Sequence, residues 1–236
     1  MQSLLANYWL ALILIAVGAY LLGSMNWAII LTRVFKGADI RQVGSGNAGA
    51  TNVLRAYGPV LAAMTFIGDV GKGVLATLLG GWLITAFDTA SAADTATLAL
   101  VGRYAAGLFV VLGHMFPLFH RFKGGKGVAA SAGLLFVLDW RAAVICLSTF
   151  IIVVGISRMV SLGSVIAEGI APFVVFMLYR LVDGMPMDYC VFFAAMILPV
   201  VVIVIWKHSS NIRRIINGTE SRLGEKATPK EEKTNE

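Results

Sequence analysis

A glycine-rich segment at residues 44–55, GSGNAGATNVLR, has the residue types of an anion-binding loop. Small residues let backbone N–H groups approach a ligand closely, and successive amides form a concave site for an anion. The guanidinium of Arg55 adds a planar donor that suits phosphate. The candidate ligands are Ser45, Gly46, Asn47, Thr51, Asn52 and Arg55. A flexible loop with helix-capping side chains has a similar composition, so this segment alone leaves both interpretations open.

Two lysines stand in a second glycine-rich segment, residues 113–127, GHMFPLFHRFKGGKG. Lys123 and Lys126 precede an apolar run, an arrangement typical of anion binding at a helix N-terminus. The segment is not a Walker A loop, because glycine follows Lys126 and the spacing differs. The alternatives are ordinary cytoplasmic lysines and, for His114, a histidine that is satisfied by a backbone carbonyl.

His208 and Asn211 lie three residues apart in a third polar segment, residues 207–220, KHSSNIRRIINGTE. In a helix they share one face, where they can position and deprotonate a hydroxyl group. The alternative is a basic amphipathic segment that lies on anionic lipid.

Membrane helices must position these segments. The 236 residues are 58% hydrophobic and only 14% charged, with a mean hydropathy of +0.81, which excludes an ordinary soluble domain. A spanning helix needs about 20 apolar residues. We expect an all-α bundle of seven transmembrane helices, at residues 8–31, 59–87, 97–119, 128–138, 142–156, 160–181 and 187–206.

Basic residues determine the predicted orientation. With seven helices and the N-terminus outside, fifteen of the nineteen Lys and Arg residues fall on the cytoplasmic side. The runs that flank Asp139 and Arg141 are short, but merging them into one helix would place the basic tail outside. The three polar segments then meet at the cytoplasmic face. We expect one catalytic domain over residues 1–226 and a disordered polar tail over residues 227–236.

Two acidic residues interrupt apolar runs. Asp69 has Lys72 three residues later, which predicts a structural ion pair, whereas Glu168 has no local partner and is left out of the predicted site. Cys146 and Cys190 lie in separate apolar runs, which favours buried thiols over a disulfide. We expect no metal and no cofactor, since the sequence has no metal-ligand spacing.

Together the three segments resemble the signature blocks of the bacterial acyl-phosphate:glycerol-3-phosphate acyltransferases, the PlsY family. They occur in the family's order, and the third departs from it at Ser209, where an arginine is common. The resemblance implies a multi-pass enzyme of the bacterial inner membrane. It would transfer an acyl group from acyl phosphate to the sn-1 hydroxyl of glycerol 3-phosphate, giving lysophosphatidate and inorganic phosphate, the first committed step of phospholipid synthesis. The HX4D pattern of other glycerolipid acyltransferases is absent, because no histidine has aspartate five positions on.

The resemblance also implies roles for single residues. Ser45, Lys126, His208 and Asn211 would be catalytic. Together with Arg55 and backbone amides near Thr51, they would hold glycerol 3-phosphate or the departing phosphate. A serine near residue 164 would join them, with Ser164 preferred over Ser161. The expected reaction is direct attack of the glycerol hydroxyl on the acyl carbonyl, and either His208 or an oxygen of the donor phosphate accepts the proton.

The expected partners are acyl phosphate, glycerol 3-phosphate and membrane lipid, with a functional link to the enzyme that makes acyl phosphate and no role for nucleic acid. No oligomeric state follows from the sequence. The main alternative function is a transporter for an organic phosphate or another anion, but transporters usually place binding groups near the bilayer midplane. A purely lipid-binding structural protein would not need the amides of Asn47, Asn52 and Asn211 beside the charges.

Overall fold

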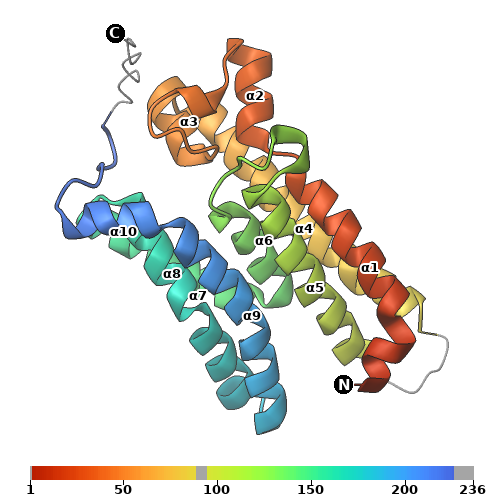
Figure 1. The fold of residues 1–236 in the computed structure, drawn as a ribbon. Coiled ribbons are helices and arrows are strands. Elements are labelled where there is room, and N and C mark those ends of the chain that lie inside the picture. The colour runs from red at the N-terminus through yellow and green to blue at the C-terminus, as the bar shows by residue number, and fades with distance from the viewer. Residues whose placement is uncertain (1, 89–94, 226–236) are drawn as a thin grey trace.

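The computed structural model describes residues 2–88 and 95–225, and every element in these ranges is helical (Figure 1). The longer helices are α1 (Gln2–Ser24), α4 (Pro59–Ala86), α5 (Thr95–Met115), α7 (Trp140–Ser157), α8 (Val160–Met177) and α9 (Met187–Lys207). The shorter ones are α2 (Trp27–Lys36), α3 (Ala50–Tyr57), α6 (Val128–Leu138) and α10 (Ser209–Ile216). Short turns at Ile40–Gln42 (η1) and Leu118–His120 (η2) and a π-helical turn at Leu178–Val182 (η3) complete the fold. The predicted tail at residues 227–236 lies outside the described residues.

Six helices in the described residues are long and apolar enough to cross a membrane. The remaining expected helix, α6, has 11 residues. At 1.5 Å per residue it is about 16 Å long, roughly half of a bilayer's hydrocarbon core. The all-helical membrane fold is thus as predicted, while the count of seven spans and their orientation stay predictions.

Helices α6 and α7 form a hairpin rather than one long helix. Asp139 between them has extended backbone angles (φ −156°, ψ 106°), and its side chain accepts the N–H groups of Arg141 and Ala142 at the start of α7. This confirms the predicted break at Asp139. The side chain of Asp139 is therefore an N-cap, which starts a new helix where the apolar pattern runs on.

The first apolar run lies in one candidate membrane span, Tyr8–Lys36, but the helix inside it is interrupted, contrary to the expectation of one continuous helix over residues 8–31. α1 ends at Ser24, and Asn26 starts α2 by accepting the Ile29 N–H at 3.1 Å. The Asn26 amide also donates to the Ala48 carbonyl at 3.2 Å. A single capping residue therefore redirects the chain and ties it to the first glycine segment.

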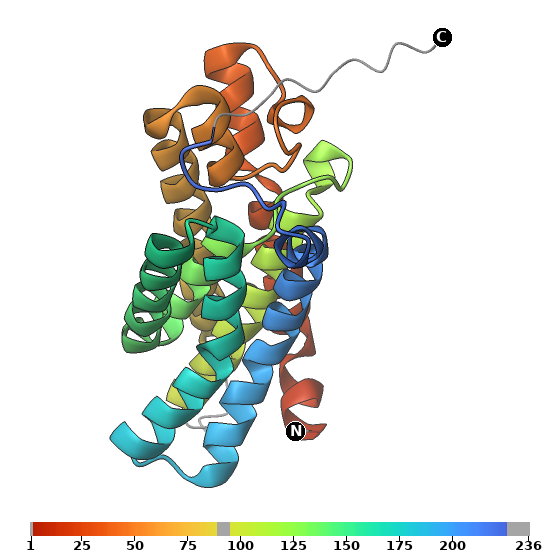
Figure 2. The same ribbon diagram turned by 90° about the vertical axis from the view of Figure 1, so that its left-hand side faces the viewer.

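The helices lie in two neighbouring groups, α1, α4, α5 and α6 in one and α7, α8 and α9 in the other (Figure 1). Glycines bring α4 and α5 into close contact, since a Cβ on Gly102 would lie only 2.3 Å from the Gly80 carbonyl oxygen. Both views place α2, α3 and α10 at the same end of the bundle, opposite the start of α1 (Figures 1 and 2). The three polar segments therefore share one end of the molecule.

Candidate active site

Five polar side chains, some from distant parts of the chain, meet beside the junction of α9 and α10. Lys126 donates to the side-chain oxygen of Asn211. The Asn211 amide and the Ser161 hydroxyl both donate to Oε1 of Glu220, at 2.7 and 2.6 Å. Arg214 binds the other oxygen of Glu220 at 2.8 Å. The second and third polar segments and the start of α8 therefore form one hydrogen-bonded cluster.

Burial and neighbouring charges shift the pKa values of Lys126 and Glu220 in this cluster. Burial lowers the pKa of Lys126 to about 8, Arg214 and Arg55 act in the same direction, and Glu220 opposes them. Burial raises the pKa of Glu220, but hydrogen bonds from Ser161, Asn211 and Arg214 outweigh burial and leave that pKa below its ordinary value. At neutral pH the cluster thus contains an ionised carboxylate and a mostly protonated lysine.

His208 lies next to the cluster as a neutral base. Its side chain is buried, and burial together with the nearby charge of Lys126 lowers its pKa to about 4. Nδ1 lies 2.8 Å from the Val204 carbonyl oxygen. In the neutral ring, Nδ1 therefore carries the proton and donates a hydrogen bond to that carbonyl. The lone pair on Nε2 is then available to accept a hydrogen bond.

The first glycine segment is shaped by Asn52. Its side-chain oxygen accepts the Ser45 N–H at 3.1 Å, and its amide nitrogen donates to the carbonyls of Val43 and Asn47 at 2.9 and 3.1 Å. Asn52 is 2% exposed. Both ends of its amide are used inside the protein, so Asn52 supports the loop instead of facing a ligand as predicted.

Three other predicted residues of this segment face outward or toward the third segment. Ser45 is exposed, and Thr51 is half-buried in the first turn of α3. Arg55 donates to the Ser221 carbonyl at 3.2 Å, and its Nε has no partner among the described residues. The first segment is thereby joined to the chain around Glu220, with donor capacity left for an anion.

A buried network supports the second glycine segment from inside the bundle. The Lys72 ammonium lies 2.8 Å from the Asp69 carboxylate, which confirms the predicted pair. The same ammonium contacts Nδ1 of His114 at 3.0 Å and donates to the carbonyls of Gly23 and Met25, each at 2.9 Å. His114 is 3% exposed, so it belongs to this internal network and not to the ligand-facing surface that was predicted for it.

Gly125 is held against His114. Its N–H donates to the His114 carbonyl at 3.1 Å, and a Cβ at this position would lie 2.1 Å from His114 Nε2 and 2.6 Å from the Ala48 carbonyl oxygen. No side chain fits there without displacing backbone of the first glycine segment. Glycine at this position therefore lets the two segments touch, immediately before Lys126.

The turn before these glycines is strained. Arg121 and Phe122 both adopt left-handed backbone angles, with φ of 56° and 57°. For residues that carry a Cβ this conformation costs about 1–2 kcal/mol each. Surrounding contacts must therefore hold the turn in place.

Helices α8 and α9, which also border the polar cluster, contribute to the wall of an apolar cavity of about 120 Å³. It is lined by residues of α6 to α9, among them Leu134, Leu138, Phe150, Ala171 and Val200. Val128, two residues after Lys126, also lines it, and on the lipid side it is bordered by Phe66 and Leu147, which are 46% and 52% exposed. One wall carries Glu168, which accepts a hydrogen bond from Ser131. The cavity thus lies in the apolar part of the bundle, and Val128 places one part of its wall close in the chain to Lys126.

Residues 13–218 match the family model of the glycerol-3-phosphate acyltransferases. A glycerol-3-phosphate acyltransferase of Clostridioides difficile is 41% identical over 216 residues, which cover 91% of this chain and 96% of that protein. One from Ralstonia pickettii is 39% identical, with coverage of 92% and 96%. The chain belongs to the glycerol-3-phosphate acyltransferase family, PlsY.

Solved structures of PlsY have the same fold. The crystal structure of PlsY (YgiH), an integral membrane glycerol 3-phosphate acyltransferase, in its glycerol 3-phosphate form is 33% identical and superposes with a TM-score of 0.73. The lysophosphatidic acid form is 30% identical with a TM-score of 0.70, and each match covers 90% of this chain. This chain is accordingly an integral membrane glycerol-3-phosphate acyltransferase.

Within this PlsY fold, two details of the cluster differ from the sequence-based expectation. Ser161, and not the preferred Ser164, reaches the cluster, because Ser164 donates to the Val160 carbonyl of its own helix at 2.9 Å. Glu220 was not predicted at all. The presence of a carboxylate in the same segment as two arginines could have pointed to Glu220. Its contact with Ser161, however, spans 59 residues, and no local sequence pattern predicts it.

Two other predictions concern metal and cysteine. Among the described residues, no group of three His, Cys, Asp or Glu side chains is placed to hold a metal ion. Cys146 and Cys190 are both free and buried, as predicted.

Proposed function

We propose that this acyltransferase uses acyl phosphate as donor and transfers the acyl group to the sn-1 hydroxyl of glycerol 3-phosphate, releasing lysophosphatidate and inorganic phosphate. The observation that carries the proposal is the position of the Lys126–Asn211–Glu220 cluster, in which the second glycine segment meets α8, a helix that lines the apolar cavity. Acyl phosphate joins an anionic head to an apolar chain. It therefore matches both parts of the site.

Two phosphate groups require two sets of donors. We assign the phosphate of glycerol 3-phosphate to Ser45, Arg55 and the backbone N–H groups of Asn47 and Thr51, and the phosphate of the donor to Lys126. Lys123, whose side chain is exposed, would attract both anions toward the site. The acyl chain of the donor would lie in the cavity, where each buried CH₂ group contributes about 0.8 kcal/mol.

The proposed reaction is a direct displacement. The sn-1 hydroxyl oxygen forms a bond to the acyl carbonyl carbon, and the bond from that carbon to the phosphate oxygen breaks, with the electron pair leaving on phosphate. Lys126 balances charge on the departing phosphate. No enzyme side chain is acylated in this scheme.

The hydroxyl proton has two candidate acceptors, Nε2 of His208 and an oxygen of the departing phosphate. The pKa of His208 is lowered to about 4, whereas the second pKa of a phosphate monoester is about 6. The proton is therefore held more stably by phosphate. We assign to His208 the role of accepting a hydrogen bond from the hydroxyl and orienting it for attack.

We place this site at the cytoplasmic face of the bacterial inner membrane, with the N-terminus outside and the C-terminus inside. The proposal rests on the excess of basic residues in the segments that share the end of the bundle with α2, α3 and α10. Acyl phosphate made in the cytoplasm would then reach the site directly, through the functional link to its producing enzyme. Labelling of a single cysteine at exposed Ser45 in intact and in permeabilised cells tests the assignment.

The donor assignment is tested with the purified protein in a mild detergent. Palmitoyl phosphate and palmitoyl-CoA are each supplied with glycerol 3-phosphate, and lysophosphatidate is measured by mass spectrometry. The proposal requires product from palmitoyl phosphate alone. Product from palmitoyl-CoA at a comparable rate would overturn the donor assignment while leaving the family's acyltransferase activity intact.

A further inference from the structure

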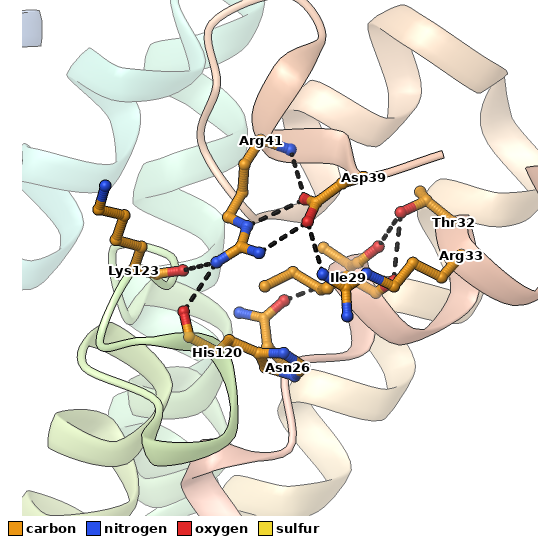
Figure 3. A network of polar contacts seen from close by, with 9 residues as sticks. Asn26, Ile29, Thr32, Arg33, Asp39, Arg41, His120 and Lys123 are labelled. Carbon is orange, nitrogen blue, oxygen red and sulfur yellow. Dashed lines mark hydrogen bonds and ion pairs between the residues drawn. The ribbon is translucent and has the colours of Figure 1, made fainter. Parts of the chain in front are cut away.

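Arg41, in the turn η1 that precedes the first glycine segment, contacts the second glycine segment (Figure 3). Its Nη1 donates to the carbonyl oxygens of His120 and Lys123, at 2.8 and 3.3 Å. Its Nε and Nη2 donate to the two carboxylate oxygens of Asp39, at 2.9 and 2.6 Å. One guanidinium group therefore ties the second glycine segment to Asp39, just before the first segment, through four hydrogen bonds, each with a defined direction.

The two carbonyls that Arg41 holds flank the strained turn. Arg121 and Phe122, the residues with left-handed backbone angles, are the two that stand between His120 and Lys123. A turn in this conformation relaxes unless its ends are fixed. Arg41 fixes both ends from outside the turn.

Asp39 in turn fixes Arg41. Its carboxylate binds the Arg41 guanidinium in a two-point contact and also accepts the backbone N–H of Arg41 at 3.0 Å, which starts η1. Although burial opposes it, the hydrogen bonds from Arg41 hold the pKa of Asp39 well below its usual range. The pair is therefore ionised and oriented throughout the physiological pH range.

Short stretches of chain connect the Arg41–Asp39 pair and the turn to Ser45 and Lys126, two of the residues proposed to bind phosphate. Ser45 follows Arg41 by four residues, and Lys126 follows Lys123 by three. Between Lys123 and Lys126, the N–H groups of Gly124 and Gly125 are bound to the end of α5, at Met115 and His114. A shift of the turn that breaks these two hydrogen bonds would move Lys126 relative to Ser45.

We propose that Arg41 and Asp39 are a positioning pair for acyl transfer, which holds the strained turn at Arg121 and Phe122 and thereby sets Lys126 opposite the first glycine segment. Neither residue touches substrate in this arrangement. The kinetic consequence rests on the proposed function, whereas the effect on the turn does not.

Arg33 provides a matched control. Its guanidinium binds the same Asp39 carboxylate at 2.8 Å, but from α2, and its side chain is 52% exposed against 21% for Arg41. In the described part of the chain, Arg41 is the one of these two arginines that reaches the second segment. Removing either guanidinium deletes one positive charge next to Asp39, and removing Arg41 alone releases the turn.

The kinetic test compares Arg41→Ala, Arg41→Lys and Arg33→Ala with wild-type protein. A misplacement of about 1 Å can cost roughly 100-fold in rate, so we expect kcat/KM for glycerol 3-phosphate to fall about 10- to 100-fold in both Arg41 variants. Arg41→Lys belongs in this group because an ammonium lacks the planar fork. Arg33→Ala should stay within about twofold of wild type, since exposed ion pairs contribute little. Equal effects of Arg41→Ala and Arg33→Ala would overturn the proposal.

A suppressor variant separates positioning from general stability. Arg121→Gly allows the left-handed angles without strain, whereas Arg121→Ala removes the same side chain and keeps the strain. In the Arg41→Ala background, we expect Arg121→Gly to restore at least a part of kcat/KM and Arg121→Ala to restore none. A loss in Arg41→Ala that neither glycine nor alanine changes would show that the turn is not what Arg41 controls.

Hydrogen–deuterium exchange gives a readout that needs no catalysis. We expect peptides that cover residues 116–127 to exchange faster in Arg41→Ala and Arg41→Lys than in wild type or Arg33→Ala, with helices α8 and α9 unchanged. Unchanged exchange at residues 116–127 would overturn the proposal. If the wild-type protein transferred no acyl group from acyl phosphate, the proposed donor would fail, and the exchange data would still decide the role of Arg41.

Discussion

Lys126 donates a hydrogen bond to the side-chain oxygen of Asn211, although 85 positions separate the two residues in the chain. Lys126 lies near the end of the second glycine segment, and Asn211 lies on α10 after the last long helix. Asn211 passes the connection on to Glu220, and Glu220 to Ser161 at the start of α8. One lysine thus links the second glycine segment to α8, one of the helices that line the apolar cavity.

Replacing this lysine should abolish most of the activity. We expect Lys126→Ala to lower kcat by about 100- to 1,000-fold, the usual effect of removing one donor that stabilises developing negative charge. Arg213→Ala is the control, because Arg213 is an exposed cation on the same helix as Asn211. Initial rates of phosphate release at saturating substrates measure both. A similar decrease in the two variants would argue against a specific role for Lys126.

The rate should also depend on the protonation of Lys126. Its pKa is lowered to about 8, so the lysine is charged at pH 7 and loses its proton as the pH rises through about 8. We expect kcat/KM for glycerol 3-phosphate to fall in this range, where the substrate is already fully ionised because its second pKa is about 6. In Lys126→Arg the fall should disappear from whatever activity is left, since arginine stays charged. A wild-type profile that stays level to pH 9.5 contradicts this assignment.

Stability should depend on the buried pair of Asp69 and Lys72. Lys72→Met leaves the Asp69 carboxylate without its partner, a change that typically costs about 3–5 kcal/mol. We expect a large decrease in the unfolding temperature in detergent for Lys72→Met and a smaller one for the double variant Asp69→Asn/Lys72→Met. Equal decreases would indicate that the charge of Asp69 does not need Lys72. The side chains are each 2% exposed, which excludes compensation by solvent.

Selectivity for the acyl chain should respond to Glu168. This carboxyl group and Ser131 form a polar spot in the wall of an otherwise apolar cavity. Glu168→Leu makes that wall apolar, so we expect kcat/KM to rise about two- to tenfold for palmitoyl phosphate relative to octanoyl phosphate. Glu168→Gln, which keeps the shape and polarity, is the control. An unchanged ratio in Glu168→Leu would show that the acyl chain does not lie against this wall.

The sequence predicted the membrane helices well because apolar runs and charge are local features. Asp139 could be placed between two helices because the flanking runs are short and the basic residues count against merging them. Asn26 was missed, since neither a proline nor a charge interrupts the apolar run around it. Its cap on α2 is local, but its second contact is with Ala48, which lies 22 residues away.

The sequence predicted that three segments form the candidate site. It did not predict which side chains in them face the site and which are used inside the protein. Asn52 and His114 have the chemistry of ligands, and the structure uses both inside the protein, because each meets backbone or charged groups from other segments. Ser161 and Ser164 lie three residues apart in one stretch of sequence, which gives no reason to choose between them. In the structure, Ser161 is the one that contacts Glu220. Roles that depend on which buried partner a side chain meets are not readable from spacing along the chain.

The central claim is direct transfer from acyl phosphate to glycerol 3-phosphate in the cluster around Lys126 and Asn211. Phosphorus NMR of one sample follows the donor, lysophosphatidate and inorganic phosphate together. Our account predicts that the two products appear in equal amounts, that neither forms without glycerol 3-phosphate, and that both nearly disappear in Lys126→Ala. Phosphate released without lysophosphatidate, or acylated protein recovered when glycerol 3-phosphate is omitted, would contradict it.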